Sequence, residues 1–117
     1  MHAPKIVTAI PKRRYRLGEF SVTILADIDS TDDAQYRYIM AVVRDGESQP
    51  GLYLTLEKSA GNEASDLNYD MRLIMQDGSQ TIGSSDAWKD MESFATQALQ
   101  LVTTILNLAD EEIRRLL

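Results

Sequence analysis

The chain has 117 residues, of which 44% are hydrophobic and 26% are charged, and this composition is typical of a single folded domain. It contains no cysteine, which excludes disulfides, thiolate zinc sites and thiol nucleophiles and agrees with a cytoplasmic location. The net charge of −6 is split, because residues 1–16 carry +5 and residues 17–117 carry −11. Such a split is typical of a basic segment attached to an acidic body.

Short strands fill most of the chain. Residues 1–4 show no regular pattern, and we expect them to be disordered. The next residues are β-branched and predict a strand, which Pro11 ends or places at a sheet edge. Further along, apolar and polar side chains alternate as in half-buried antiparallel strands, and Asp77-Gly78 predicts a hairpin. The predicted strands are residues 5–10, 19–28, 35–44, 52–57, 67–75 and 80–82, so the sheet lies within residues 5–83.

Residues 85–117 predict one long amphipathic helix, because apolar residues recur along one side at helical spacing. Ser84 and Ser85 are suitable caps for its start. A helix of this length is a rod of roughly 45 Å, longer than the roughly 17–20 Å of an ordinary strand. Its apolar face is therefore either all core or partly an interface between two copies of the chain. The residues with the spacing of a helix pair are Met91, Phe94, Ala98, Leu101, Ile105 and Leu108.

Together these elements predict an α+β fold, in which an antiparallel meander sheet of five or six strands is covered by one long C-terminal helix. Residues 1–117 are expected to form one domain. Strands followed by one long helix resemble the order in the Whirly-type and coactivator-type families, whose members dimerise through the helix and bind single-stranded nucleic acid on the sheet. The resemblance concerns the architecture, and no site residue of those families is carried over.

No catalytic, metal-binding or cofactor motif stands out in the sequence. The single histidine, His2, lies in the segment expected to be disordered, whereas a general base needs fixed geometry. Asp27, Asp29, Asp32 and Asp33 lack the spacing of a calcium-binding loop and are interpreted as solvated turn residues. The glycines occur singly and form no phosphate-binding loop. We therefore expect no enzyme activity, no cofactor and no metal.

The strongest candidate for a binding site is the basic segment, which consists of Lys12, Arg13, Arg14, Tyr15 and Arg16. Its cations can neutralise phosphates while Tyr15 stacks on a base, or they can pair with acidic groups of this chain or of a partner. The acidic body repels a polyanion, which disfavours nucleic acid.

The leading functional hypothesis is a small cytoplasmic protein-interaction or structural module that forms a homodimer through its C-terminal helix and could also bind another protein. One alternative is a single-stranded nucleic-acid-binding protein that uses the basic segment. Another is a small-molecule-binding domain with a pocket between sheet and helix. No stretch is long and apolar enough to predict a membrane association.

Overall fold

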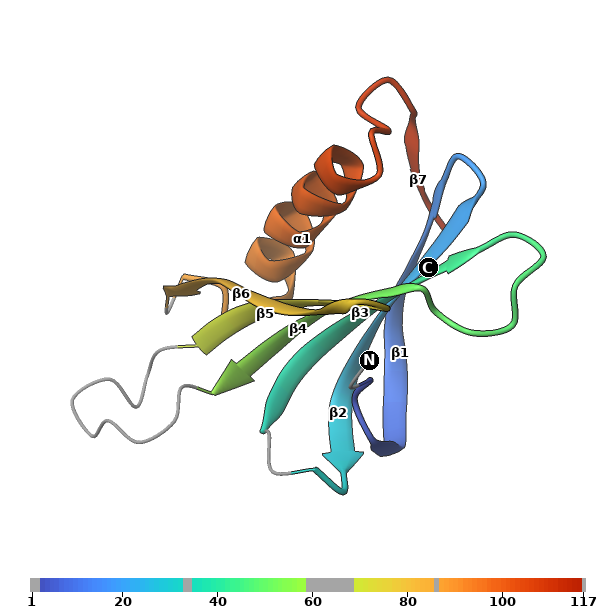
Figure 1. The fold of residues 1–117 in the computed structure, drawn as a ribbon. Helices are drawn as coiled ribbons and strands as arrows, with labels where there is room; N and C mark the ends of the chain where they lie inside the picture. Colours follow the sequence, from blue (N-terminus) through green and yellow to red (C-terminus); the bar gives the residue numbers. More distant parts are fainter. Residues whose placement is uncertain (1–2, 33–34, 59–68, 86, 117) are drawn as a thin grey trace.

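The computed structural model describes residues 3–32, 35–58, 69–85 and 87–116. Within these residues, seven strands form one antiparallel sheet in the order β6-β5-β4-β3-β2-β1-β7, and one helix, α1, lies across one face of it (Figure 1). The predicted α+β meander is therefore confirmed. The elements are β1 (Ile6–Leu17), β2 (Phe20–Ser30), β3 (Tyr36–Arg44), β4 (Leu52–Lys58), β5 (Tyr69–Met75), β6 (Gly78–Ser85), α1 (Met91–Ile105) and β7 (Ile113–Arg115).

The hydrophobic core lies between α1 and the sheet face that the helix covers. Side chains alternate between the two faces along each strand, and the most apolar set points toward the helix. Phe94 of α1 is fully buried, and its ring stacks on that of Tyr38 of β3 with 5.4 Å between the centroids. The core residues are Tyr15, Leu17, Val22, Ile24, Ala26, Tyr38, Met40, Val42, Leu52, Leu54, Leu56, Met71, Phe94, Ala95, Ala98, Leu99 and Val102.

The helix begins at Met91 rather than near residue 85, so the predicted start is wrong. Ser84 and Ser85, predicted as caps, form the end of β6 instead. The cap is Asp90, whose side chain accepts a hydrogen bond from the Ser93 amide at 2.8 Å and satisfies a free N–H of the first turn. This hydrogen bond holds the pKa of Asp90 below its ordinary value.

The helix ends at Ile105, so the prediction of one helix reaching residue 117 is also wrong. Asn107 adopts a left-handed conformation with a φ of 56°, which asparagine tolerates and which ends a helix. Three consecutive acids at residues 110–112 would also face the negative end of the helix dipole. The chain instead turns back and forms β7, which pairs antiparallel with residues 15–17 of β1 (Figure 1).

The apolar face of α1 packs on the chain's own sheet. Phe94 and Ala98, two of the residues with helix-pair spacing, are fully buried. The other four are partly buried against the same core, namely Met91, Leu101, Ile105 and Leu108. The structure thus uses this face as core. Pairing of two copies through it stays a prediction, and it would require part of the core to open.

The N-terminal residues that the structure describes, from Ala3 onward, lie against the sheet, whereas residues 1–2 of the segment expected to be disordered lie outside the described residues. Pro4 is buried, and the carbonyl of Lys5 accepts a hydrogen bond from the Thr31 amide at 2.9 Å. β1 then continues through Pro11, where no other described strand pairs with its outer side. The predicted edge position of Pro11 is therefore confirmed. His2 lies outside the described residues.

The described residues contain seven strands, one more than the upper predicted number of six. Six strands precede the helix, and β7 follows it. The turn between β5 and β6 consists of Gln76 and Asp77, one residue earlier than the predicted Asp77-Gly78. Among the described residues, no helix is long and apolar enough to cross a membrane.

Candidate functional site

The basic segment predicted as a binding site is part of β1, near one edge of the sheet. Tyr15 is only 4% exposed and belongs to the core beneath α1. A nucleic-acid base therefore cannot stack on Tyr15 unless this part of the core unfolds. The strand fold explains the change of role, because alternation along β1 sends Tyr15 inward together with Leu17.

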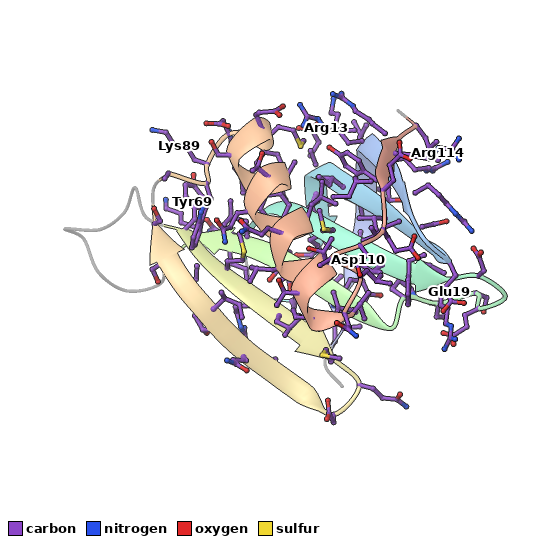
Figure 2. All side chains as sticks on the ribbon, turned by 90° about the horizontal axis from the view of Figure 1, so that it is seen from above. Arg13, Glu19, Tyr69, Lys89, Asp110 and Arg114 are labelled. Carbon is purple, nitrogen blue, oxygen red and sulfur yellow. The ribbon has the colours of Figure 1, made fainter. Side chains whose placement is uncertain are left out.

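Three of the four cations in this segment are paired with carboxylates. Lys12 lies 3.7 Å from Asp27. Arg13 reaches the first turn of α1 and donates to Glu92 at 2.7 Å (Figure 2). The third cation, Arg16, donates to Asp45 at 2.8 Å, and this hydrogen bond holds the pKa of the Asp45 carboxyl below its ordinary value. The prediction that the cations pair with acids of this chain is confirmed for Lys12, Arg13 and Arg16.

The fold adds a second basic group to this edge. β7 places Arg114 directly opposite Arg16 and Arg115 directly opposite Tyr15. Arg14 and Arg114 are exposed. Arg16 and Arg114 face each other across the two strands, and such like charges disfavour pairing unless an anion lies nearby. Sequence reasoning could not join residues 114–115 to the basic segment, because it placed them at the end of a helix.

This edge also carries exposed apolar side chains. Four large hydrophobic side chains are strongly exposed among the described residues, and all four lie at this edge. Two are on β1, one is on β7, and one is Leu116, which directly follows β7. These side chains are Val7 (58% exposed), Ile10 (48%), Ile113 (41%) and Leu116 (54%). We call β1, β7 and Leu116 together the β1–β7 edge.

A different site lies on the sheet face opposite α1, where the N-terminal residues pass (Figure 1). It is a cavity of about 320 Å³ whose lining comes from the N-terminal segment, the turn after β2 and strands β3, β5 and β6. We call it the polar cavity, and its lining residues are Ala3, Lys5, Asp32, Tyr36, Arg72, Ile74 and Ser79.

Asp32 is the acceptor at the centre of the hydrogen bonds on one side of the polar cavity. Its Oδ2 accepts from the Tyr36 hydroxyl at 2.7 Å and from the Lys5 amide at 3.2 Å. Burial alone raises the pKa of Asp32, but these hydrogen bonds outweigh it and hold the pKa below its ordinary value. The Oδ1 atom is buried and has no hydrogen-bond partner among the described residues.

Arg72 is the cation on the other side of the polar cavity. It donates from Nη2 to Ser79 at 3.0 Å, and its Nη1 lies 3.7 Å from Glu57, beyond hydrogen-bond distance. Glu57 is 9% exposed, and its other oxygen accepts from the buried Thr55 hydroxyl at 2.7 Å. The Nε atom of Arg72 is buried and has no hydrogen-bond partner among the described residues.

The polar cavity was not predicted from the sequence. Alternation placed Tyr36 on the same face as Tyr38, but a register shift between them pairs Tyr36 with Glu57 and Tyr38 with Leu56. Tyr36 therefore points away from the helix. Asp32 lies in the turn after β2, as predicted, but it is only partly exposed and its carboxylate accepts hydrogen bonds from Tyr36 and Lys5. Asp33 of the same run lies outside the described residues. The sequence contains no pattern that predicts the bulge in β3.

Tyrosine ionisation tests the geometry of the polar cavity. Burial and the nearby Asp32 raise the pKa of Tyr36, so the hydroxyl stays protonated well above its ordinary value of 10.0. Because the folded pKa is raised, this contribution to stability is present below pH 10 and is lost as the pH rises further. We expect ultraviolet titration to show late-ionising tyrosines, including Tyr53, whose pKa burial also raises. Tyr36→Phe should remove one late-ionising group, and an unchanged titration curve would contradict the placement of Tyr36.

A further hollow of about 290 Å³ opens between the end of α1 and the sheet, where a small-molecule pocket was hypothesised. Its lining includes Phe20, Leu52, Met75, Leu106 and the cation Arg44. Arg44 is already paired with Glu19 at 3.1 Å. This hollow therefore offers weaker polar recognition than the polar cavity.

Metal chemistry receives no support from the described residues, in which no three acidic, histidine or cysteine side chains converge on one point. The chain matches no protein family model, no curated protein and no solved structure at a significant level. Its candidate sites are therefore interpreted from their own geometry.

Proposed function

We propose that the protein is an interaction module that binds an acidic, partly apolar polypeptide segment along the β1–β7 edge. The observation that carries this proposal is the gathering of the strongly exposed large hydrophobic side chains, among the described residues, at one edge of the sheet. Scattered exposed apolar residues are ordinary on protein surfaces, whereas gathered ones mark interaction sites.

The backbone of β1 supports the same proposal. β7 pairs only with residues 15–17, and the Leu116 amide donates to the Arg14 carbonyl at 2.7 Å. No described strand pairs with the outer side of residues 6–13. An extended segment can add to such an edge through main-chain hydrogen bonds, with alternate side chains contacting Val7 and Ile10.

The charges favour an acidic partner. Arg14 and Arg114 are exposed at this edge, and Lys12 lies only 3.7 Å from Asp27 in an exposed pair that a competing carboxylate can replace at little cost. Pro11 and the register shifts along β1 limit unselective pairing with other strands. The edge thus favours an extended segment that carries negative charge over an extended segment without such charge.

Fluorescence anisotropy tests the proposal directly. The probe is a labelled peptide of about eight residues that alternates glutamate with valine, compared with a glutamate–serine peptide and with single-stranded DNA and RNA. We expect the glutamate–valine peptide to bind best, because only it supplies both the charges and the apolar contacts. Measurements at about 50 and 200 mM salt separate these probes, since phosphate neutralisation gives a steep salt dependence.

Substitutions at the edge provide the matched control. Arg14→Gln with Arg114→Gln should weaken peptide binding about fivefold to tenfold. Arg44→Gln removes an exposed arginine of β3 that pairs with Glu19 and should leave binding unchanged. Tight DNA binding that falls steeply with salt would instead favour the nucleic-acid alternative. Equal binding of both peptides would remove the role assigned to Val7 and Ile10.

A further inference from the structure

We propose that a hollow beside the start of α1 binds a small organic acid, with its carboxylate on Arg37 and Lys12 and its apolar body against Ile28 and Met91. The lining of this hollow comes from β1, β2, β3 and the first residue of α1. Its volume is about 550 Å³, within the range of about 300–1,000 Å³ for ligand pockets. We call it the cationic hollow, and the lining residues that bind the acid or position its contacts are Lys12, Asp27, Ile28, Arg37, Tyr38 and Met91.

Arg37 is the residue that recognises the carboxylate. Its Nε donates to the Lys89 carbonyl at 2.8 Å, and its guanidinium carbon lies 5.3 Å from the centre of the Tyr38 ring. The side chain is exposed, and its two Nη groups have no hydrogen-bond partner among the described residues. Two contacts thus hold the planar group in place and leave its Nη donors free. Such donors match the two oxygens of a carboxylate.

Lys12 and Asp27 form an exposed ion pair in the same hollow. The Nζ of Lys12 lies 3.7 Å from Oδ2 of Asp27, and the two side chains are 47% and 65% exposed. An ion pair this long and this exposed is weak, so Lys12 remains available to a second carboxylate. Lys12, Asp27 and Arg37 together give the lining a net charge of +1. One carboxylate neutralises this charge, whereas a phosphate dianion would reverse it.

The cationic hollow lies at a break in the regular pairing of the sheet. Asp27 has a φ of 50°, a left-handed conformation that aspartate tolerates better than most residues. The pairing of β1 with β2 shifts register at this point, from Ile10–Ala26 to Thr8–Asp29. Asp27 and Ile28 therefore belong to a β-bulge. Bulges redirect side chains and are frequent beside binding sites.

The apolar part of the lining retains accessible surface. Ile28 and Met91 are only partly buried, so the body of a ligand can contact both. Tyr38 is 8% exposed and forms part of the floor. Tyr36 also lines the hollow, but its hydroxyl already donates to Asp32 at 2.7 Å. Because charged and apolar surface occur together, the hollow favours an acid with an apolar body over a bare anion.

Nuclear magnetic resonance titration of the full chain tests the inference. The probes are hexanoate and benzoate, compared with hexanol, which lacks the charge, and with acetate, which lacks the apolar body. We expect at least one of the two acids to give saturable shifts at the amides of Asp27, Arg37 and Met91. Hexanol and acetate should bind at least about fivefold more weakly, since each makes only one kind of contact. Equal binding of hexanol or acetate would overturn the inference, as would no saturable shift with either acid.

Substitutions at the hollow show which groups bind the acid. Arg37→Gln removes the free Nη donors and should weaken binding at least about tenfold. Asp27→Asn should instead strengthen binding about threefold, because it removes the anion that competes for Lys12 while asparagine keeps the left-handed conformation. Arg44→Gln removes an exposed arginine at the other end of β3 and should have no effect. The dispersion of each spectrum shows whether the variant is folded. Binding that persists in Arg37→Gln, or that falls in Asp27→Asn, would contradict the proposed contacts.

The cationic hollow and the β1–β7 edge can be tested separately, because Lys12 is the one lining residue that belongs to both. Arg37→Gln should leave binding of the glutamate–valine peptide unchanged. Arg14→Gln with Arg114→Gln should weaken binding of that peptide and leave binding of the acid unchanged. If the acid instead lost its binding in the Arg14 and Arg114 variant, it would bind at the edge and the inference about the hollow would fail.

Discussion

Replacing Val102 with aspartate is expected to unfold the protein. Val102 is fully buried between α1 and the sheet, so the new carboxylate would lose its water without gaining a partner. Such a change typically costs more than about 4 kcal/mol of unfolding free energy, against a total stability of about 5–15 kcal/mol for an ordinary domain. Far-ultraviolet circular dichroism and urea unfolding at neutral pH would measure the loss.

Substitutions at the two preceding positions test which side of the helix faces the sheet. Gln100→Asp places the same charge on the exposed side of α1 and should change stability by no more than about 0.5 kcal/mol. Leu101→Asp should be intermediate, because Leu101 is only partly buried against the core and an aspartate there can turn toward water. If Val102→Asp melted like Gln100→Asp, the assignment of the buried face of α1 would be wrong.

The sequence predicted the fold class and the buried side of the helix, but not the ends of the helix. Hydrophobic periodicity reports which residues share a side, and this is why Phe94 and Ala98 were placed correctly. Periodicity continued past Ile105, yet the left-handed Asn107 ended the helix. Leu106 and Leu108 remain packed on the core after the chain has left the helix, which explains why their apolar pattern resembled helix.

Edge strands explain why the candidate binding residues were predicted only in part. The basic segment was identified from composition, but its pairing with Asp27, Glu92 and Asp45 depends on three separate elements that only the fold brings together. The same limit applies to the arginines of β7. A short strand at an edge has little sequence signal of its own, since its pairing partner is more than 90 residues away.

The polar cavity illustrates a second limit of sequence reasoning. Arg72 lies on a well-predicted strand, and alternation correctly separates it from Met71. Asp32, however, comes from the turn after β2, and Tyr36 changes face through a bulge that no residue pattern signals. A site assembled from five segments of the chain becomes visible only when the register of every strand is known.

Phe94→Ala is expected to cost about 3–5 kcal/mol of unfolding free energy. The phenyl ring is fully buried and stacks on Tyr38, so its removal leaves a cavity and also ends an aromatic contact. Thr96→Ala, on the exposed side of the same helix, should remain within about 0.5 kcal/mol of the parent protein. Urea unfolding followed by circular dichroism would give both values.

Phe94→Ala also distinguishes two roles for the apolar face of α1, namely the core of one chain and the interface between two copies. Phe94 has the spacing of a helix pair but is fully buried within one chain. If it stabilises only its own domain, the unfolding midpoint and the cost of Phe94→Ala do not depend on protein concentration. If two copies packed through α1, dissociation would be coupled to unfolding and the midpoint would rise with concentration. We expect the cost of Phe94→Ala itself to be independent of concentration, because a side chain already enclosed by Tyr38 and the sheet has no surface left for a second copy. A midpoint that rises with concentration would assign the predicted helix pairing to the partly buried Met91, Leu101, Ile105 and Leu108.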